Sequence, residues 1–165
     1  MIVIRSPHTK EEFRDYYSLR YQVLRQPWGQ HQGSEKDDYE PISQHFMAVD
    51  DQTGEIVGVV KLLEKEPGVA WFSHLAVLPR YQRKGIGKQL VEHAENVARE
   101  QGFHSIGAYS RLNSTEYFKR FGYQITGLPS PYFGAVQVVW MEKKLTADLT
   151  DRGGAAENAA QPPQQ

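Results

Sequence analysis

The chain has 165 residues, 39% of them apolar, and a formal net charge of −1. This length and composition suit one domain with a hydrophobic core, and the dispersed basic residues argue against a broad nucleic-acid-binding face. The absence of cysteine excludes disulfides, a thiol nucleophile and thiolate metal sites. Because no apolar run reaches membrane-spanning length and the N-terminus does not read as a signal peptide, we expect a cytoplasmic monomer or homodimer without membrane contact.

The first elements are a short strand over residues 2–5 and a helix that begins after Thr9. Thr9 and Glu12 have the spacing of a capping box, and one apolar face runs from Phe13 to Leu24, ahead of Pro27. We expect this face to pack in the core.

Residues 30–43 form an acidic loop that is too long to be only a tight connection. Its carboxylates would suit a cationic amine, although a solvated loop is the simpler interpretation. The candidate substrate-binding residues are Glu35 and Asp38 of this loop, Arg20 on the flank of the preceding helix, which we expect to be exposed, and Trp28 between the helix and the loop.

Strands are expected over residues 45–49, 56–63 and 71–78, with turns after the first two. The 3.6-residue apolar period from Ile86 predicts a helix that Gly102 ends. A strand over 104–109 should then lie parallel to the strand over 71–78, because a helix connects them.

The C-terminal part is predicted to hold a short helix over 114–121, with Asn113 as its N-cap, and strands over 123–126 and 135–143. A Gly-Leu-Pro-Ser-Pro loop joins these strands. Residues 146–165 lack aromatic residues and are predicted to be disordered, so the single domain should span 1–145.

The most informative segment is the glycine turn, residues 82–88, between the strand over 71–78 and the helix from Ile86. A helix N-terminus offers unpaired N–H groups, glycine allows close approach to the backbone, and Arg83, Lys84 and Lys88 add positive charge. A phosphate or pyrophosphate is the expected ligand. The turn lacks the Gly-Lys-Ser/Thr ending of NTP-binding loops and the three glycines of the dinucleotide fingerprint.

The pattern Gln-x-x-Gly-x-Gly at Gln82, Gly85 and Gly87 resembles the defining loop of the GNAT superfamily of acyl-CoA-dependent N-acyltransferases. A second element of that family, an Asn-led helix ending in a Gly-aromatic pair, is similar to residues 113–123. The resemblance implies an α/β fold of the mixed α+β kind, in the order β-α-β-β-β-α-β-α-β-β. Its central sheet would have six to seven strands, flanked by helices.

The resemblance also implies acetyl-CoA as co-substrate, no metal, and transfer of the acetyl group to a primary amine of a small molecule or peptide in a ternary complex. The pyrophosphate would lie on the glycine turn, and a bulge in the preceding strand would free backbone groups for the pantetheine arm. One strand N–H would polarise the thioester carbonyl. The implied cofactor-binding residues are Leu75, Ala76, Val77, Gln82, Arg83, Lys84, Gly85, Ile86, Gly87, Lys88, Asn113 and Phe118.

The proton transfers are where the chain departs from the family pattern. Ser73 stands where a strand carboxylate often acts as base, so the neighbouring His74 is the candidate proton acceptor. Phe118 occupies the usual position of the tyrosine acid, and Tyr117 precedes it by one residue, about 100° away on a helix. His74 and Tyr117 are the candidate catalytic residues.

Other assignments remain open at this point. Glu35, Asp38 and Tyr109 are more remote candidates for the base, and Ser110 or water could protonate the thiolate. A non-catalytic acyl-CoA-binding or sensing domain is the alternative function, and a nucleotide-phosphate-binding domain is a third.

Overall fold

The computed structural model describes residues 1–145, so the predicted C-terminal tail lies outside the described residues. The described strands form one mixed sheet in the order β1-β2-β3-β4-β5-β8-β6, and β7 pairs with β8. The strands are β1 (Ile2–Arg5), β2 (Gln44–Asp50), β3 (Glu55–Glu66), β4 (Val69–Val77), β5 (Ser105–Arg111), β6 (Gln124–Ile125), β7 (Ser130–Phe133) and β8 (Val136–Lys144). The helices are α1 (Lys10–Leu24), α2 (Ile86–Glu100) and α3 (Thr115–Lys119), with short 3₁₀ helices η1 (Gln26–Trp28), η2 (Glu40–Ile42), η3 (Pro79–Tyr81) and η4 (Leu112–Ser114).

The order and the mixed sheet predicted from the sequence are confirmed, with one strand more than expected. The chain divides into two compact units. The first unit contains Met1–Leu63 and Phe72–Ala94, and the second contains Glu64–Trp71 and the chain from Glu95 onward. No helix among residues 1–145 is long and apolar enough to cross a membrane.

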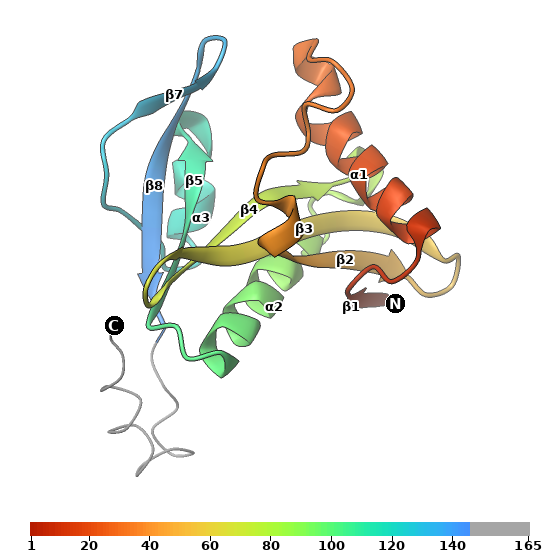
Figure 1. Cartoon of the computed structure of the whole chain (residues 1–165), viewed down its shortest axis with the longest axis horizontal. Coiled ribbons are helices and arrows are strands. Elements are labelled where there is room, and N and C mark those ends of the chain that lie inside the picture. Colours follow the sequence, from red (N-terminus) through yellow and green to blue (C-terminus); the bar gives the residue numbers. More distant parts are fainter. Residues whose placement is uncertain (146–165) are drawn as a thin grey trace. The chain divides into compact units, whose positions relative to one another are not determined.

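In the first unit, α1 and α2 cover opposite faces of β2 and β3 (Figure 1). On one face, the Tyr16 hydroxyl of α1 lies 2.8 Å from His45 Nδ1 and donates to the Val60 carbonyl at 3.3 Å. On the other face, the rings of Phe46 and His93 pack edge to face with centroids 4.6 Å apart. The alternation of side chains along β2 thus supplies both helices with contacts.

The capping box predicted at the N-terminus of α1 would have two hydrogen bonds, and the structure forms one of them. The Thr9 side chain accepts from the Glu12 N–H at 3.0 Å, as expected. The Glu12 carboxylate accepts instead from the His8 N–H at 2.7 Å and pairs with Arg5. Glu12 therefore ties the start of the helix to the end of β1 and does not complete the capping box.

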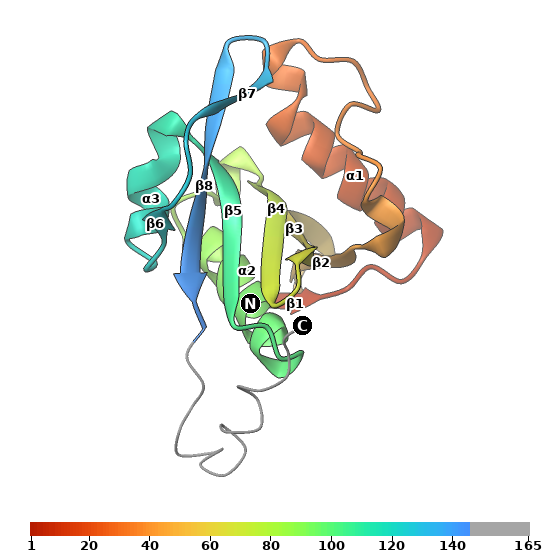
Figure 2. The same ribbon diagram turned by 60° about the vertical axis from the view of Figure 1, so that its left-hand side comes forward.

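In the second unit, β5 pairs antiparallel with β8 over its whole length, and Figure 2 shows the two strands side by side. The first three residues of β4 pair parallel with β5, which confirms the predicted direction. Glu95 is buried, and its carboxylate accepts from the Tyr123 hydroxyl at 2.7 Å and from Lys143 Nζ at 3.2 Å. These bonds fix the segment after α3 to α2 and β8.

Two local predictions are wrong. The loop that contains Pro129 and Pro131 includes β7, an edge strand on β8, where a proline costs no central ladder bond. The third helix is limited to residues 115–119, and its N-cap position is Ser114 without a side-chain cap. Asn113 lies one residue earlier, in η4, so it does not cap the helix.

Candidate active site

The glycine turn is fixed at its start by contacts within the first unit. The Leu78 N–H donates to the Val57 carbonyl of β3 at 2.9 Å, and the Gln82 side chain donates to the Val77 carbonyl at the same distance. Arg83 and Gly85 then adopt left-handed backbone conformations, with φ of 64° and 83°. Glycine suits the second position because it adopts positive φ without steric cost.

This turn leaves a row of backbone donors without protein partners. Within the described chain, the N–H groups of residues 83–88 donate no hydrogen bond, although the Gly85 carbonyl accepts from Gln89 and so begins α2. Residues in left-handed conformation can gather successive N–H groups into an anion-binding concavity, and a helix N-terminus adds its dipole. A Cβ built at Gly85 would have no heavy atom of the described residues within 4 Å, apart from its own chain neighbours, so the space beside this Cα is open.

Positive side chains surround these donors. Arg83, Lys84 and Lys88 are exposed and pair with no carboxylate among the residues described, while Lys84 Nζ lies 5.6 Å from the centre of the Tyr81 ring. Ile86 is 3% exposed and anchors the first turn of α2 in the core. The arrangement can bind a pyrophosphate, and the donor set therefore fits coenzyme A.

The strand that leads to the turn is distorted at His74. This residue has a φ of 55°, which is uncommon for a residue other than glycine and departs from strand geometry. The parallel register of β4 with β5 ends earlier, at Trp71 opposite Gly107. The backbone of this strand is thus irregular at His74, and Leu75, Ala76 and Val77 follow it; the bulge that would free backbone groups stays a prediction.

His74 is held in a setting that favours its neutral form. Its Nδ1 lies 3.1 Å from the Ser73 hydroxyl. Burial lowers the pKa of His74 well below its usual 6.5, and the positive charges of Arg20 and Lys61 act in the same direction. The imidazole is therefore uncharged at neutral pH and able to accept a proton.

Those two cations belong to an ion network of Arg20, Asp37, Glu40 and Lys61, all in the first unit. Glu40 Oε2 accepts from Arg20 Nη1 and from Lys61 Nζ, each at 2.9 Å, and Lys61 Nζ also donates to Asp37 Oδ1 at 2.6 Å. The side chains of Arg20 and Lys61 are 0% exposed. The network joins α1, β3 and the acidic loop through fully paired charges.

Sequence reasoning missed Glu40 and Lys61. Lys61 stands inside the apolar run from Val57 to Leu63, where a charged residue is unusual unless it has a buried partner. That position was the available signal. Its partners could not be identified, since they lie on a loop more than twenty residues away in the sequence.

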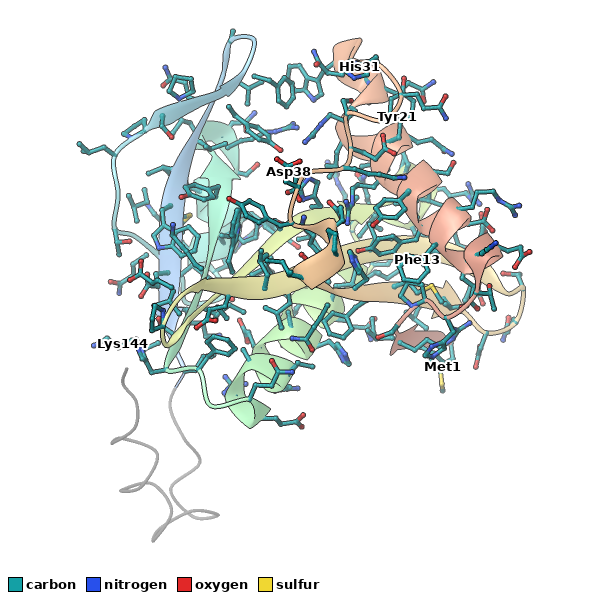
Figure 3. The ribbon with its side chains drawn as sticks, in the orientation of Figure 1. Met1, Phe13, Tyr21, His31, Asp38 and Lys144 are labelled. Carbon is teal, nitrogen blue, oxygen red and sulfur yellow. The ribbon has the colours of Figure 1, made fainter. Side chains whose placement is uncertain are left out.

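The candidate substrate-binding residues have different environments in the structure, and the expected exposure of Arg20 is wrong. Arg20 is buried, and its remaining bonds go to the Glu35 carbonyl at 3.0 Å and the Tyr16 hydroxyl at 2.9 Å. Glu35 is 5% exposed, and its carboxylate accepts a hydrogen bond from the Gly33 N–H at 2.8 Å. Trp28 is 48% exposed, and Asp38, which Figure 3 labels on the segment before η2, is also exposed. Only these last two present their side chains to solvent.

The remaining candidates, Asn113, Tyr117 and Phe118, belong to the second unit. The Tyr117 ring packs edge to face against Phe118 and Phe121, and burial raises the pKa of its hydroxyl. That hydroxyl has no hydrogen-bond partner in the described part of the chain. Asn113 is exposed, and its amide oxygen accepts from Ser114.

The curated proteins that match this chain include two that are named as N-acetyltransferases. The chain is 35% identical over 103 residues to an uncharacterised N-acetyltransferase of Chlorobaculum tepidum, and 32% identical over 90 residues to the GCN5-related N-acetyltransferase 4, chloroplastic, of Arabidopsis thaliana. These matches cover 62% and 53% of this chain, and 61% and 29% of the relatives. The matched part is thus less than two thirds of either relative.

Solved structures share the fold at lower identity. A crystal structure named as an N-acetyltransferase from Lactobacillus plantarum has a TM-score of 0.79 at 23% identity, covering 88% of this chain and 99% of that one. An aminoglycoside 6′-N-acetyltransferase complexed with coenzyme A has a TM-score of 0.73 at 17% identity, covering 89% and 98%. At these identities the likeness shows the fold.

The family model described as Acetyltransferase (GNAT) family matches residues 9–123, which include α1, the ion network, the glycine turn and α3. This match spans more than half of the chain and includes both the irregular strand β4 and the glycine turn. The chain therefore belongs to the GNAT family of acetyltransferases.

Proposed function

We propose that the protein is an N-acetyltransferase that transfers an acetyl group from acetyl-CoA to a primary amine of a small molecule or peptide, by direct attack in a ternary complex. The observation that carries this proposal is the row of unpaired N–H groups at residues 83–88, in a chain of the GNAT family. These donors, with Arg83 and Lys88, would hold the pyrophosphate of the co-substrate.

In the proposed reaction, the amine nitrogen attacks the thioester carbonyl carbon, a C–N bond forms and the C–S bond breaks. The amine loses one proton and the departing thiolate gains one, so the reaction needs an acceptor and a donor of protons. The backbone of Leu75 to Val77 would supply an N–H to the carbonyl oxygen as negative charge develops there.

His74 is the proposed proton acceptor. Its lowered pKa keeps it neutral at pH 7, at the cost of weaker basicity. Tyr117 is the proposed donor to the thiolate, and its raised pKa makes it a weak acid. Water is the alternative donor.

A panel of amines tests the function. Acetyl-CoA is incubated with the protein and each amine, and release of free coenzyme A is measured together with the mass of the acetylated product. We expect at least one amine to gain an acetyl group. A rise in melting temperature with coenzyme A but no transfer to any amine would favour the alternative, a non-catalytic acyl-CoA-binding or sensing domain.

A further inference from the structure

The second unit carries an aromatic platform formed by Trp71 of β4, Tyr109 of β5 and Trp140 of β8. The Tyr109 ring packs edge to face against Trp71, with centroids 5.6 Å apart, and against Trp140, at 5.0 Å. Tyr109 and Trp140 are direct partners in the register of β5 and β8. Because side chains alternate along strands, the register places these rings on one face of the sheet.

The backbone is adapted to this platform at Gly107. A Cβ at that position would lie far inside contact distance of the Trp140 indole, so only glycine leaves room for the ring above the strand. The other edge of the same indole is fixed by its Nε1, which donates to Glu142 Oε1 at 2.8 Å. The backbone at Gly107 and the hydrogen bond to Glu142 therefore both fix the position of the Trp140 ring.

Lys65 of β3 places its ammonium on this platform. Its Nζ lies 4.8 Å from the Trp140 ring centre, 5.3 Å from Tyr109 and 6.0 Å from Trp71, all within the range of cation–π attraction. The same nitrogen donates to the Tyr109 hydroxyl at 3.1 Å. Lys65 is an exposed residue, yet its charged end is held by three rings and one hydrogen bond.

This ammonium has no anionic partner. Within residues 1–145, Lys65 forms no ion pair with a carboxylate, so two of its three N–H donors remain available. The Tyr109 hydroxyl accepts from Lys65, which leaves its own hydrogen free to donate. A carboxylate could accept from both groups at once, and charge-assisted bonds of this kind are the stronger ones.

We infer that Lys65 and Tyr109 form a subsite for the carboxylate of an acceptor amine, such as an amino acid or a peptide C-terminus. This inference rests on the proposed function. A second cation is a poorer ligand, because the tethered Lys65 ammonium already occupies the platform and repels it. Trp71 belongs to β4, four residues ahead of Leu75 on the strand proposed to hold the thioester.

The direct test uses ligands that cannot react. N-acetyl-leucine and N-acetyl-leucine amide differ only in the carboxylate, and their binding is measured by calorimetry and by fluorescence of the tryptophans. We expect the acid to bind about 10-fold more tightly to the wild type. Lys65→Met should abolish this preference, Lys65→Arg should retain most of it, and Tyr109→Phe should reduce it.

Lys144→Met, which removes an exposed lysine of the same unit from the end of β8, is the matched control and should behave as wild type. Thermal unfolding confirms that each variant is folded. Equal binding of acid and amide by the wild type, or an unchanged preference in folded Lys65→Met, would overturn the inference. Tighter binding of leucinamide than of N-acetyl-leucine would also overturn it, in favour of a cation site.

Initial rates separate this inference from the proposed function. With leucine and leucinamide as acceptors, Lys65→Met should raise KM for leucine alone. If both amines are acetylated without any effect of Lys65, the subsite is wrong and the proposed function stands. If neither amine nor any other is acetylated, but binding of N-acetyl-leucine depends on Lys65, the proposed function fails and the carboxylate site stands.

Discussion

The first unit contains two charged regions that are built in opposite ways. In the ion network, two cations with 0% exposed side chains face Glu40 and Asp37, and each charged group has a partner of opposite sign. In the glycine turn, Arg83, Lys84 and Lys88 are exposed, and the neighbouring N–H groups lack protein partners. One region satisfies its charges internally, and the other leaves them available.

The difference follows from where each region lies. A buried charge without a partner costs several kcal/mol, so the network is tolerable only because each of its charges has a partner of opposite sign. Exposed donors are hydrogen-bonded to water in the free protein, so the absence of a protein partner costs them little free energy. Paired charges in this unit therefore hold the acidic loop in place, and unpaired charges indicate where an anion would bind.

The largest expected effect comes from breaking the network. Glu40→Gln keeps the shape of the side chain but removes the anion shared by Arg20 and Lys61, leaving excess positive charge in a buried site. We expect the free energy of unfolding to fall by about 3 kcal/mol, measured by urea denaturation. Lys144→Met serves as the surface control, with a change of at most about 0.5 kcal/mol.

The free energy of unfolding of the same variant, measured as a function of pH, provides a second test of the network. Although burial opposes it, the charge of Arg20 and the hydrogen bond from Lys61 hold the pKa of Glu40 well below its usual 4.5. Glu40 therefore stabilises the folded state above about pH 4.5, and this contribution is lost as the pH falls further. Glu40→Gln should lack that part of the acid destabilisation; an unchanged profile would mean that the network contributes little.

A second prediction connects the network to the chemistry through His74. If this residue accepts the amine proton, His74→Gln should lower turnover by about 100-fold while leaving the affinity for coenzyme A near that of the wild type. The acidic limb of the wild-type rate profile should lie below pH 6.5, since burial and the network cations lower the pKa. An unperturbed histidine would give an acidic limb centred between about pH 6 and 7. The buried setting of His74 argues against a limb at that pH.

Stability provides the control for that variant. A histidine whose pKa is lowered on folding favours the folded state above about pH 6.5, and its contribution declines as the pH falls from there toward the lowered pKa. His74→Gln should remove this decline as well as the acidic limb of the rate. If the rate and its profile survive the substitution, His74 has a structural role and ordered water accepts the proton.

Sequence reasoning located the glycine turn because its information is local. A strand, a proline, two glycines and the apolar period from Ile86 lie within one short stretch, and the structure places them as expected. The positive φ of His74 could not be predicted in the same way, since nothing in its side chain requires it and tertiary contacts impose it. The same limit applies to Glu40, whose partners come from α1 and β3.

The C-terminal elements show a different limit. Asn113 is a good N-cap residue by propensity, yet it lies inside η4, and α3 begins directly after η4, at Thr115. Helix α3 has only five residues, and tertiary context outweighs propensity in an element this short. Boundaries here were therefore less predictable than in α2.

The glycine turn itself provides a third prediction, of intermediate size. Replacing both Arg83 and Lys88 with alanine should weaken coenzyme A binding by about 10-fold at low salt, because two exposed cations that each contribute about 0.7 kcal/mol beside a phosphate together account for about 1.4 kcal/mol. The effect should shrink as salt rises and screens the charges. Calorimetry at two salt concentrations measures both, and Lys144→Ala is the control.

The backbone donors should keep part of the affinity in that double variant. If binding is lost completely, the side chains rather than residues 83–88 of the backbone hold the ligand. If affinity is unchanged at every salt concentration, the unpaired cations do not mark the anion site, and the contrast with the ion network has no functional meaning.

The smallest expected effect concerns Tyr117, which extends the comparison to an unpaired donor in the second unit. Its hydroxyl lacks a partner within residues 1–145, as the amides of the glycine turn do, but burial raises its pKa and makes it a poor proton donor. Phe118 beside it has no donor at all. We therefore expect Tyr117→Phe to reduce turnover by less than about 3-fold, measured under saturating acetyl-CoA, with water protonating the thiolate instead. A loss of 100-fold, together with loss of the alkaline limb of the rate profile, would show that an unpaired donor can mark the catalytic acid even where its pKa is unfavourable.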